Sequence, residues 1–522
     1  MRRYIRLIAQ CSPVRLIGIT GAHPYSRGGE DRHFLLNRRH LRWRFGSVVL
    51  LILFFLAGQF LPPVGVASAT IPPQQPAGAA RERFVVMISV DGLVPDYYLN
   101  PDRYGLKVPT LRRLRESGAY ADGVIGVYPS VTYPSHTAMV TGARPRDHGI
   151  YSNRIFEDPT EPPTGRWYWW ANAIQTDTLW KAARRAGLKT AAISWPVTVG
   201  AEIDYNIPEI TDPGTDFHAL NPAVRREATP GLIDEILRTL PQPLSSYSQD
   251  DLRIEAATFI LTRYKPNLML LHLVELDGVH HRFGPHSKEA YEEAEKQDGR
   301  IKRILDAVNR AGIEDRTTIV LVSDHGFMPI EREFHPGVLM VRGGLVTLNA
   351  EGRVTAWKAA VWSHGGSAAI LLRDNRDEAT VQALRKIFAE YVGQPSSPLK
   401  QIVERAELEA LGADPRAIFF LEPADYWYIG GEYRGEVIRP ARNRGAHGQL
   451  PSRPVVRASL ILAGAGIRRG ARVPVVNMTD IAPTVAAVLG IKLAVPPYSQ
   501  PLTALLESSS SSTGRSASRS HR

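Results

Sequence analysis

An acidic side chain follows each of three apolar segments of the sequence, directly or within a few residues, and histidines accompany it after two of them. A further histidine, His447, lies late in the chain in the phrase GAHG. Ligands of open α/β sheets bind at the carboxyl ends of the strands. If the apolar segments are strands, these side chains meet at one edge of a sheet. The residues concerned are Asp91, Asp277, His280, His281, Asp324, His325 and His447.

The side-chain types at this edge favour a metal site without sulfur ligands. The chain has one cysteine, Cys11, which lies upstream of a predicted cleavage point, so a thiolate site and a disulfide are not expected. Carboxylate and imidazole ligands suit a borderline divalent ion, and zinc is the ion we expect. Six such ligands are enough for two ions, although manganese or iron could occupy the same ligands.

A second motif, YPSVTYPSH over residues 128–136, is followed by the pairs TG and HG. By itself it reads as a Ser/Pro loop before a helix that starts near His136. It also contains Thr132, whose hydroxyl is a poor nucleophile at neutral pH unless a cation lowers its pKa.

Taken together, these motifs resemble the nucleotide pyrophosphatase/phosphodiesterase family of the alkaline phosphatase superfamily. The phrases VDG, TYPSH, DGVHHRFGP, SDHG and GAHG occur in the family's order, and the resemblance spans residues 82–495. It implies an alkaline phosphatase-like fold and two zinc ions per chain. The implied ligands are Asp277, His281 and His447 for the first zinc and Asp91, Asp324, His325 and the Thr132 hydroxyl for the second.

The resemblance also implies roles in catalysis. Thr132 would be the nucleophile, and Asn153 would donate a hydrogen bond to a phosphoryl oxygen. His281 is preferred to His280 as a ligand because the segment HRFGP fits the family phrase, and His280 stays as the alternative.

Aromatic residues supply candidates for substrate binding. By the resemblance, Tyr133 would stack on a nucleobase, and Tyr205, which follows the phrase Trp195-Pro196, would be a second platform. Tyr133 could equally pack its own loop, and the aromatic run 167–170 could line the pocket or pack the cap.

The implied function is an exported phosphodiesterase or nucleotide pyrophosphatase that acts through a phospho-threonine on small phosphodiester or nucleotide substrates. A phosphomonoesterase or a phosphonoacetate hydrolase of the same superfamily is the first alternative, and a catalytically inactive binding module is the second. A sulfatase is disfavoured because the loop at Thr132 lacks the C/S-x-P-x-R phrase.

The elements that must position these residues have the pattern of an α/β fold. Short apolar runs at residues 84–90, 189–194, 268–274, 318–322, 368–372 and 460–463 predict strands buried on both faces. Helical periodicity intervenes, as at residues 301–308, 179–186 and 481–489. The alternation predicts a mostly parallel central sheet with helices on both faces. Residues 82–507 would form this domain, with an inserted cap at about 328–445.

The net charge of +11 is no sign of a nucleic-acid partner. Ten arginines against two acids lie in residues 1–69, and a Ser/Arg tail follows at 508–522, so the body between them is nearly neutral. The arginines precede the apolar run 48–57 and the small-residue phrase 67–69, which predicts a secretory signal peptide at 1–69, followed by a linker at 70–81. Export to the periplasm or the medium follows; an uncleaved leader would instead anchor the chain in a membrane. The sequence does not specify an oligomeric state.

Overall fold

The computed structural model of the protein describes residues 82–210 and 221–508. The predicted leader (1–69), the predicted linker (70–81) and the predicted tail beyond residue 508 lie outside the described residues. Within 82–210 and 221–508, no helix has the length and the apolar character that crossing a membrane requires.

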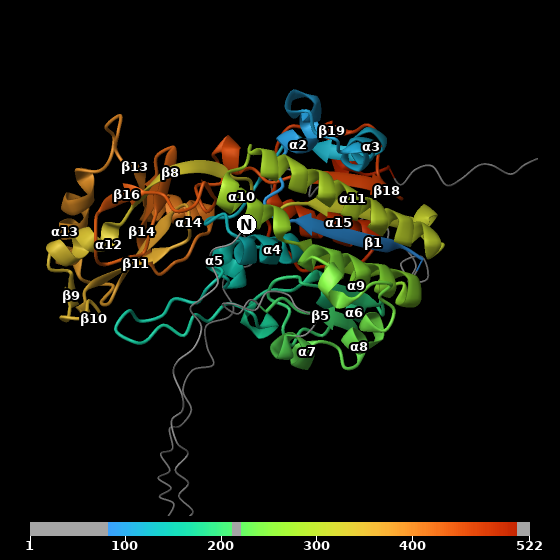
Figure 1. Ribbon diagram of the computed structural model, residues 1–522, viewed down its shortest axis with the longest axis horizontal. Helices are drawn as coiled ribbons and strands as arrows, with labels where there is room; N and C mark the ends of the chain where they lie inside the picture. Colours follow the sequence, from blue (N-terminus) through green and yellow to red (C-terminus); the bar gives the residue numbers. More distant parts are fainter. Residues whose placement is uncertain (1–81, 211–220, 509–522) are drawn as a thin grey trace, which may run out of the picture. The chain divides into compact units, whose positions relative to one another are not determined.

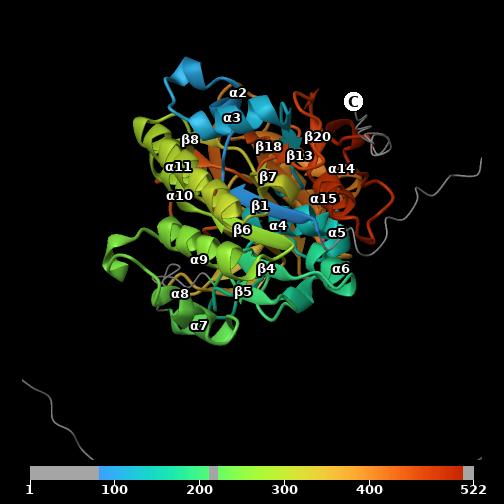
Figure 2. The same cartoon turned by 90° about the vertical axis from the view of Figure 1, so that its right-hand side faces the viewer.

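An eight-stranded central sheet carries the fold (Figure 2). Its strands, in their spatial order, are β19 (Arg472–Val473), β2 (Ala119–Ala121), β18 (Leu460–Gly464), β7 (Thr317–Val322), β1 (Phe84–Val90), β6 (Leu268–Leu273), β4 (Thr190–Ile193) and β5 (Tyr205–Ile207). The five neighbours from β7 to β5 are parallel, whereas β18 runs antiparallel to β7. The mostly parallel sheet expected from the sequence is confirmed, with an antiparallel part on one side.

The central strands are mainly apolar because both faces of the sheet are covered. Along β1, Val86 and Ile88 belong to one hydrophobic core, and Val85 and Met87 belong to the core on the opposite face. Successive side chains of a strand point to opposite faces, so a strand between two cores is apolar on both of its faces. Burial of each of these side chains contributes about 1.5–3 kcal/mol.

Helices cover both faces of this sheet (Figure 2). One core takes side chains from α9 (Gln249–Tyr264) and α11 (Lys288–Arg310). The other takes them from α4 (Thr132–Thr141), α6 (Leu179–Arg185) and α15 (Ile481–Leu489). Helices on both faces, as expected, leave the carboxyl edge of the parallel strands as the place where polar side chains gather.

Local signals in the sequence set the ends of these helices. The Ser287 hydroxyl accepts a hydrogen bond from the backbone N–H of Ala290 at the start of α11. At the end of α15, Gly490 adopts a φ of +69°, a left-handed conformation that glycine adopts without a steric penalty. Both ends agree with the sequence pattern.

Residues 328–446 contain further sheets (Figure 1). The strands and helices of this region are β8 (Met328–Phe334), α12 (Pro336–Arg342), β9 (Val346–Leu348), β10 (Val354–Trp357), β11 (Ala359–Ser363), β12 (Ala368–Leu372), α13 (Glu378–Ala389), β13 (Leu399–Glu404), α14 (Arg405–Leu411), β14 (Ala417–Pro423), β15 (Tyr426–Ile429), β16 (Ile438–Pro440) and β17 (Gly445–Ala446). The strands β11, β12, β14 and β13 form an antiparallel sheet with a hydrophobic core of its own. We refer to residues 328–446 as the cap.

Candidate active site

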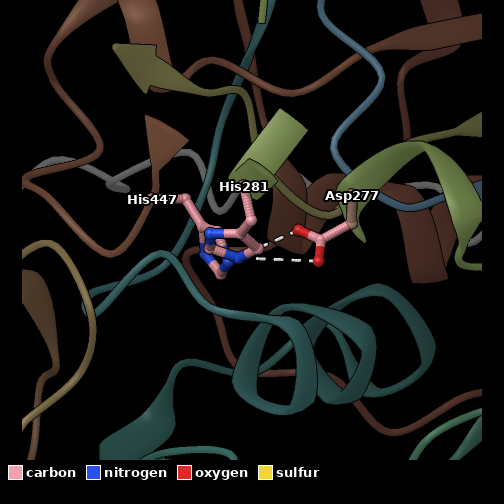
Figure 3. Close-up of side chains that lie close together, drawn as sticks. All are labelled: Asp277, His281 and His447. Atoms are coloured by element: carbon pink, nitrogen blue, oxygen red, sulfur yellow. Dashed lines mark ion pairs between the residues drawn. The ribbon is translucent and has the colours of Figure 1, made fainter. Parts of the chain in front are cut away.

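The first ligand group consists of Asp277, His281 and His447 (Figure 3). Asp277 and His281 lie one turn apart on α10 (Glu275–Phe283), which follows β6, and His447 follows β17. The Nε2 atoms of both histidines lie 3.5 Å from oxygens of Asp277. Their Nδ1 atoms lie against the backbone carbonyls of Gly445 (2.9 Å) and Ser130 (3.1 Å), which orients each ring with Nε2 toward the carboxylate.

The second group consists of Asp91, Asp324 and His325, all of them buried. Asp91 directly follows β1, and Asp324 and His325 follow the neighbouring strand β7. His325 Nε2 lies 3.3 Å from Asp91 Oδ1 and 3.1 Å from Asp324 Oδ2. The backbone N–H groups of Gly92 and His325 donate to Asp324 Oδ1 (3.1 Å each), so its other oxygen faces the group.

The two groups are neighbours, since the rings of His325 and His447 stack with centroids 3.5 Å apart. In each group the possible ligand atoms lie within 4.8 Å of one another. Among the described residues, Asp91 Oδ1, Asp277 Oδ1, Asp324 Oδ2 and His325 Nε2 are buried without a hydrogen-bond partner. A buried polar atom without a partner is costly. One cation in each group would satisfy all four atoms. The donor set therefore fits two metal ions held by carboxylate and imidazole.

Charge within the second group also favours a cation. Burial raises the pKa of the Asp91 carboxyl well above its usual range, and the charges of Asp324 and Asp277 raise it further. Burial lowers the pKa of the His325 imidazole, but the carboxylate of Asp324 more than offsets this and raises the pKa to about 9. Burial and the proximity of other carboxylates oppose ionisation of Asp91, and a divalent ion would favour the ionised form of both carboxylates.

Thr132 is the first residue of α4 and is 8% exposed. Residues on either side of it contact both ligand groups. The Ser130 carbonyl faces His447 Nδ1 (3.1 Å), and His136, one turn into α4, lies 3.8 Å from Asp324 Oδ2. The helix begins at Thr132, four residues earlier than the sequence suggested. The hydroxyl therefore stands at a helix N-terminus, where backbone N–H groups favour an anion.

Asn153 and Tyr133 lie beside Thr132. The Asn153 Oδ1 atom accepts a hydrogen bond from the backbone N–H of Tyr133 (2.9 Å), which orients the amide group. The Tyr133 ring is fully buried, its hydroxyl donates to Glu209 Oε1 (3.2 Å), and it contacts the ring of Trp167. In this structure the Tyr133 side chain therefore packs against its surroundings, which is one of the two roles that the sequence left open for it.

The structure does not bring Tyr205 to this site. Its ring stacks on Tyr264, the last residue of α9, with centroids 4.1 Å apart. Tyr205 pairs with Ala191 at the first position of β5, so it lies toward the amino end of a parallel strand, whereas the ligand groups lie beyond the carboxyl ends. The Trp195-Pro196 phrase does not specify where the chain runs before β5 begins. We therefore do not retain Tyr205 as a substrate platform.

The side chain of His280, the alternative ligand, points in a different direction from that of His281. Its Nε2 atom lies 3.1 Å from the hydroxyl of Tyr97, and the ring is fully buried. Consecutive residues of a helix face different directions, so only one of the two histidines can meet Asp277. The structure places His281 in the ligand group and His280 in the protein interior.

A distant aspartate holds the start of α10, the helix that carries two of the ligands. The buried carboxylate of Asp250 accepts hydrogen bonds from the backbone N–H groups of Val274 (2.9 Å) and Glu275 (3.0 Å). Asp250, Glu275 and Glu293 form a third acidic group, but the guanidinium of Arg300 ion-pairs with all three. Arg300 and Arg253, which also pairs with Asp250, offset the negative charge of this group, and the group supports α10.

Two buried residues that the sequence analysis did not assign to the site, His272 and Glu209, contact it. His272 Nε2 lies 3.1 Å from Asp91 Oδ2, and its Nδ1 lies 2.9 Å from Glu209 Oε2. Burial lowers the pKa of His272, but the hydrogen bonds to these two carboxylates raise it to about 10. The signal for His272 was present in the sequence, because it interrupts the apolar strand LMLLHL.

The structure is thus an α/β fold with a candidate metal centre beyond the carboxyl edge of its central sheet. The sequence matches the type I phosphodiesterase / nucleotide pyrophosphatase family over residues 85–448. The chain belongs to this family.

Curated relatives match about half of the chain. The human ectonucleotide pyrophosphatase/phosphodiesterase family member 1 is 26% identical over 265 residues, which are 49% of this chain and 24% of that protein. An uncharacterised pyrophosphatase/phosphodiesterase of Schizosaccharomyces pombe is 28% identical over 259 residues, covering 47% of this chain and 45% of the relative. The aligned part thus spans less than half the length of either relative.

Solved structures share the fold. Human ectonucleotide pyrophosphatase/phosphodiesterase 5 superposes with a TM-score of 0.58 at 18% identity, over 82% of this chain and 100% of the other. The murine protein, as an inactive threonine-to-alanine variant in complex with AMP, superposes with a TM-score of 0.56 at 18% identity, over 79% of this chain and 96% of that one. At this identity the likeness establishes the alkaline phosphatase-like architecture of the sheet and helices.

Proposed function

We propose that this protein is an exported dinuclear-zinc phosphodiesterase or nucleotide pyrophosphatase that uses Thr132 as its nucleophile. The observation that carries the proposal is the pair of ligand groups beyond β1, β6 and β7, next to the start of α4. Family membership supports the reaction class, because the family name covers phosphodiesterases and nucleotide pyrophosphatases.

Each part of the site has a role in this reaction. Divalent ions held by the two groups would lower the pKa of the Thr132 hydroxyl and offset charge on the phosphoryl oxygens. The Thr132 hydroxyl gives up its proton to solvent as its oxygen attacks phosphorus. The bond from phosphorus to the leaving oxygen breaks, and the leaving group departs with the electron pair and takes up a proton from solvent. Water then attacks the phospho-threonine, and the bond from phosphorus to the Thr132 oxygen breaks, which restores the hydroxyl. The Asn153 amide donates a hydrogen bond to a phosphoryl oxygen throughout.

A nucleotide is the substrate type that we favour. Tyr133 lies next to Thr132, and an aromatic ring in contact with a base contributes about 1–3 kcal/mol to binding. The AMP complex of the murine neighbour supports this choice. Because the Tyr133 ring is buried, base contact requires the side chains around it to move.

The test compares bis(p-nitrophenyl) phosphate with p-nitrophenyl phosphate on the purified protein loaded with zinc. The proposal predicts a higher kcat/KM for the diester. A higher kcat/KM for the monoester would make the protein a phosphomonoesterase and would overturn the diesterase assignment.

Thr132→Ala is the matched variant for this assay. It should lower kcat about 10³-fold or more because it removes the attacking oxygen, while metal analysis should still find two zinc ions. Near-native turnover by this variant would contradict the covalent route.

A further inference from the structure

Four buried side chains form a continuous chain of contacts from the nucleophile helix to a metal ligand. The Tyr133 hydroxyl donates to Glu209 Oε1 (3.2 Å), Glu209 Oε2 faces His272 Nδ1 (2.9 Å), and His272 Nε2 faces Asp91 Oδ2 (3.1 Å). The four residues come from the start of α4, the segment after β5, the strand β6 and the end of β1. The contacts therefore join four separate parts of the fold at one edge of the sheet.

Packing alone does not explain a histidine at position 272. Every other residue of β6 is Leu or Met, and all six side chains are buried. A buried imidazole loses hydration that an aliphatic side chain would not need to lose, and it is tolerated only when its nitrogens find partners. His272 has a carboxylate oxygen at each nitrogen, so it serves a polar connection between Glu209 and Asp91.

This connection determines how the Asp91 carboxylate is turned. His272 holds Oδ2, and the other oxygen, Oδ1, lies 3.3 Å from His325 Nε2 within the second ligand group. Among the described residues Oδ1 has no hydrogen-bond partner. A carboxylate fixed through one oxygen presents the other to a cation, and removal of such a support typically lowers metal affinity about 10–100-fold.

We propose that Glu209 and His272 are positioning residues that hold Asp91 in the orientation needed to bind the second cation. Glu209 also holds the Tyr133 hydroxyl, one residue from Thr132, so the same carboxylate positions the metal ligand and the start of the nucleophile helix. This inference rests on the proposed function, because it assumes that the second group binds a metal.

The main test is Glu209→Gln, which keeps the size of the side chain but removes its charge. Zinc affinity is measured by competition with a chromophoric chelator, together with kcat and KM for bis(p-nitrophenyl) phosphate. We expect the weaker of the two zinc sites to lose about 10-fold or more in affinity. We also expect kcat to fall at limiting zinc and to recover when zinc is raised to saturation.

Two further variants separate positioning from general stability. Tyr133→Phe breaks the contact farthest from Asp91, so it should leave zinc affinity within about 2-fold of the wild type. Glu202→Gln is the matched control, since Glu202 lies just before β5 and has an exposed side chain that pairs with Arg184. It should change neither zinc affinity nor turnover.

A purely structural role predicts a different pattern. In that case Glu209→Gln would lower the midpoint of urea unfolding of the zinc-free protein, while the folded variant would bind both zinc ions with wild-type affinity. That result would overturn the inference and leave the proposed function intact. If the wild-type protein bound no zinc and hydrolysed no diester, the proposed function and this inference would both fail.

Discussion

At the residue scale, the direction in which each candidate ligand histidine presents Nε2 depends on what its Nδ1 contacts. In His281, His325 and His447, Nδ1 lies within 3.1 Å of a backbone carbonyl. Each ring is thereby held with Nε2 toward a carboxylate. Close backbone approach makes one of these contacts possible, because a Cβ at Gly445 would lie 2.5 Å from the His280 carbonyl oxygen.

The adjacent residues His280 and His281 offer a matched pair of substitutions. His281→Asn should remove zinc from the first group and lower activity strongly, because the imidazole that lies beside Asp277 in that group is lost. His280→Asn should keep both zinc ions, since its imidazole faces Tyr97. Zinc content by mass spectrometry and the thermal unfolding midpoint check this. Loss of zinc in His280→Asn, with zinc retained in His281→Asn, would contradict the ligand assignment.

The sequence predicted the ligand groups because each ligand stands near a strand end or in a short motif. Asp91 directly follows β1, and Asp324 directly follows Ser323 at the end of β7, so strand prediction located them. Glu209 gave no such signal, because its contact with His272 depends on the turn that follows β5. Tyr205 was misplaced for the same reason, since the direction of a loop depends on tertiary packing.

At the element scale, a buried carboxylate connects the cap to the segment that precedes Thr132. Glu422 in β14 accepts hydrogen bonds from the Leu450 N–H (3.0 Å) and the Tyr128 hydroxyl (3.3 Å), and it ion-pairs with Arg453. Leu450 and Tyr128 lie three and four residues from His447 and Thr132 respectively. Glu422 thus joins the two loops of the site to the cap.

The pH dependence of stability tests this contact. Burial raises the pKa of Glu422 from 4.5 to about 7, although Arg453 opposes the rise. The folded state then binds more protons than the unfolded state between these values, so this contribution to the free energy of unfolding falls as pH rises from 4.5 to about 7. The loss is about 3 kcal/mol at full extent.

Glu422→Gln should therefore show a smaller loss of stability between pH 5 and pH 8 than the wild type in urea unfolding. Arg453 keeps its ion pair with Asp425 in this variant. The cost of losing the Glu422 contact shifts the free energy of unfolding by a similar amount across this pH range, so the comparison is made on the slope with pH. The exposed residue Glu351 provides the control, because Glu351→Gln should keep the wild-type slope. Equal slopes for Glu422→Gln and the wild type would show that Glu422 stays ionised throughout.

Element prediction succeeded where local pattern and burial agree. The strand β1 and the helix α15 have the bounds that the sequence indicated, because β1 is a short, mainly apolar run and α15 ends before a glycine. The segment Ala368–Leu372 is a strand as expected, but it belongs to the antiparallel sheet of the cap. The apolar run does not specify which sheet it joins, since pairing depends on long-range contacts.

At the scale of the whole molecule, the charge distribution separates a nearly neutral body from its basic N-terminal segment. The leader predicted at residues 1–69 ends in Ala67-Ser68-Ala69, so we expect a secreted protein that starts at Thr70. N-terminal sequencing of the protein exported by a bacterial host checks this. An intact leader in the membrane fraction would instead show an anchored chain.

The central claim is that two cations lie beyond the central sheet, beside Thr132. Anomalous diffraction at the zinc edge, on crystals of the zinc-loaded protein, tests it most directly. Our account predicts two peaks, one among Asp277, His281 and His447 and one among Asp91, Asp324 and His325. A single peak, or peaks away from these side chains, would contradict it.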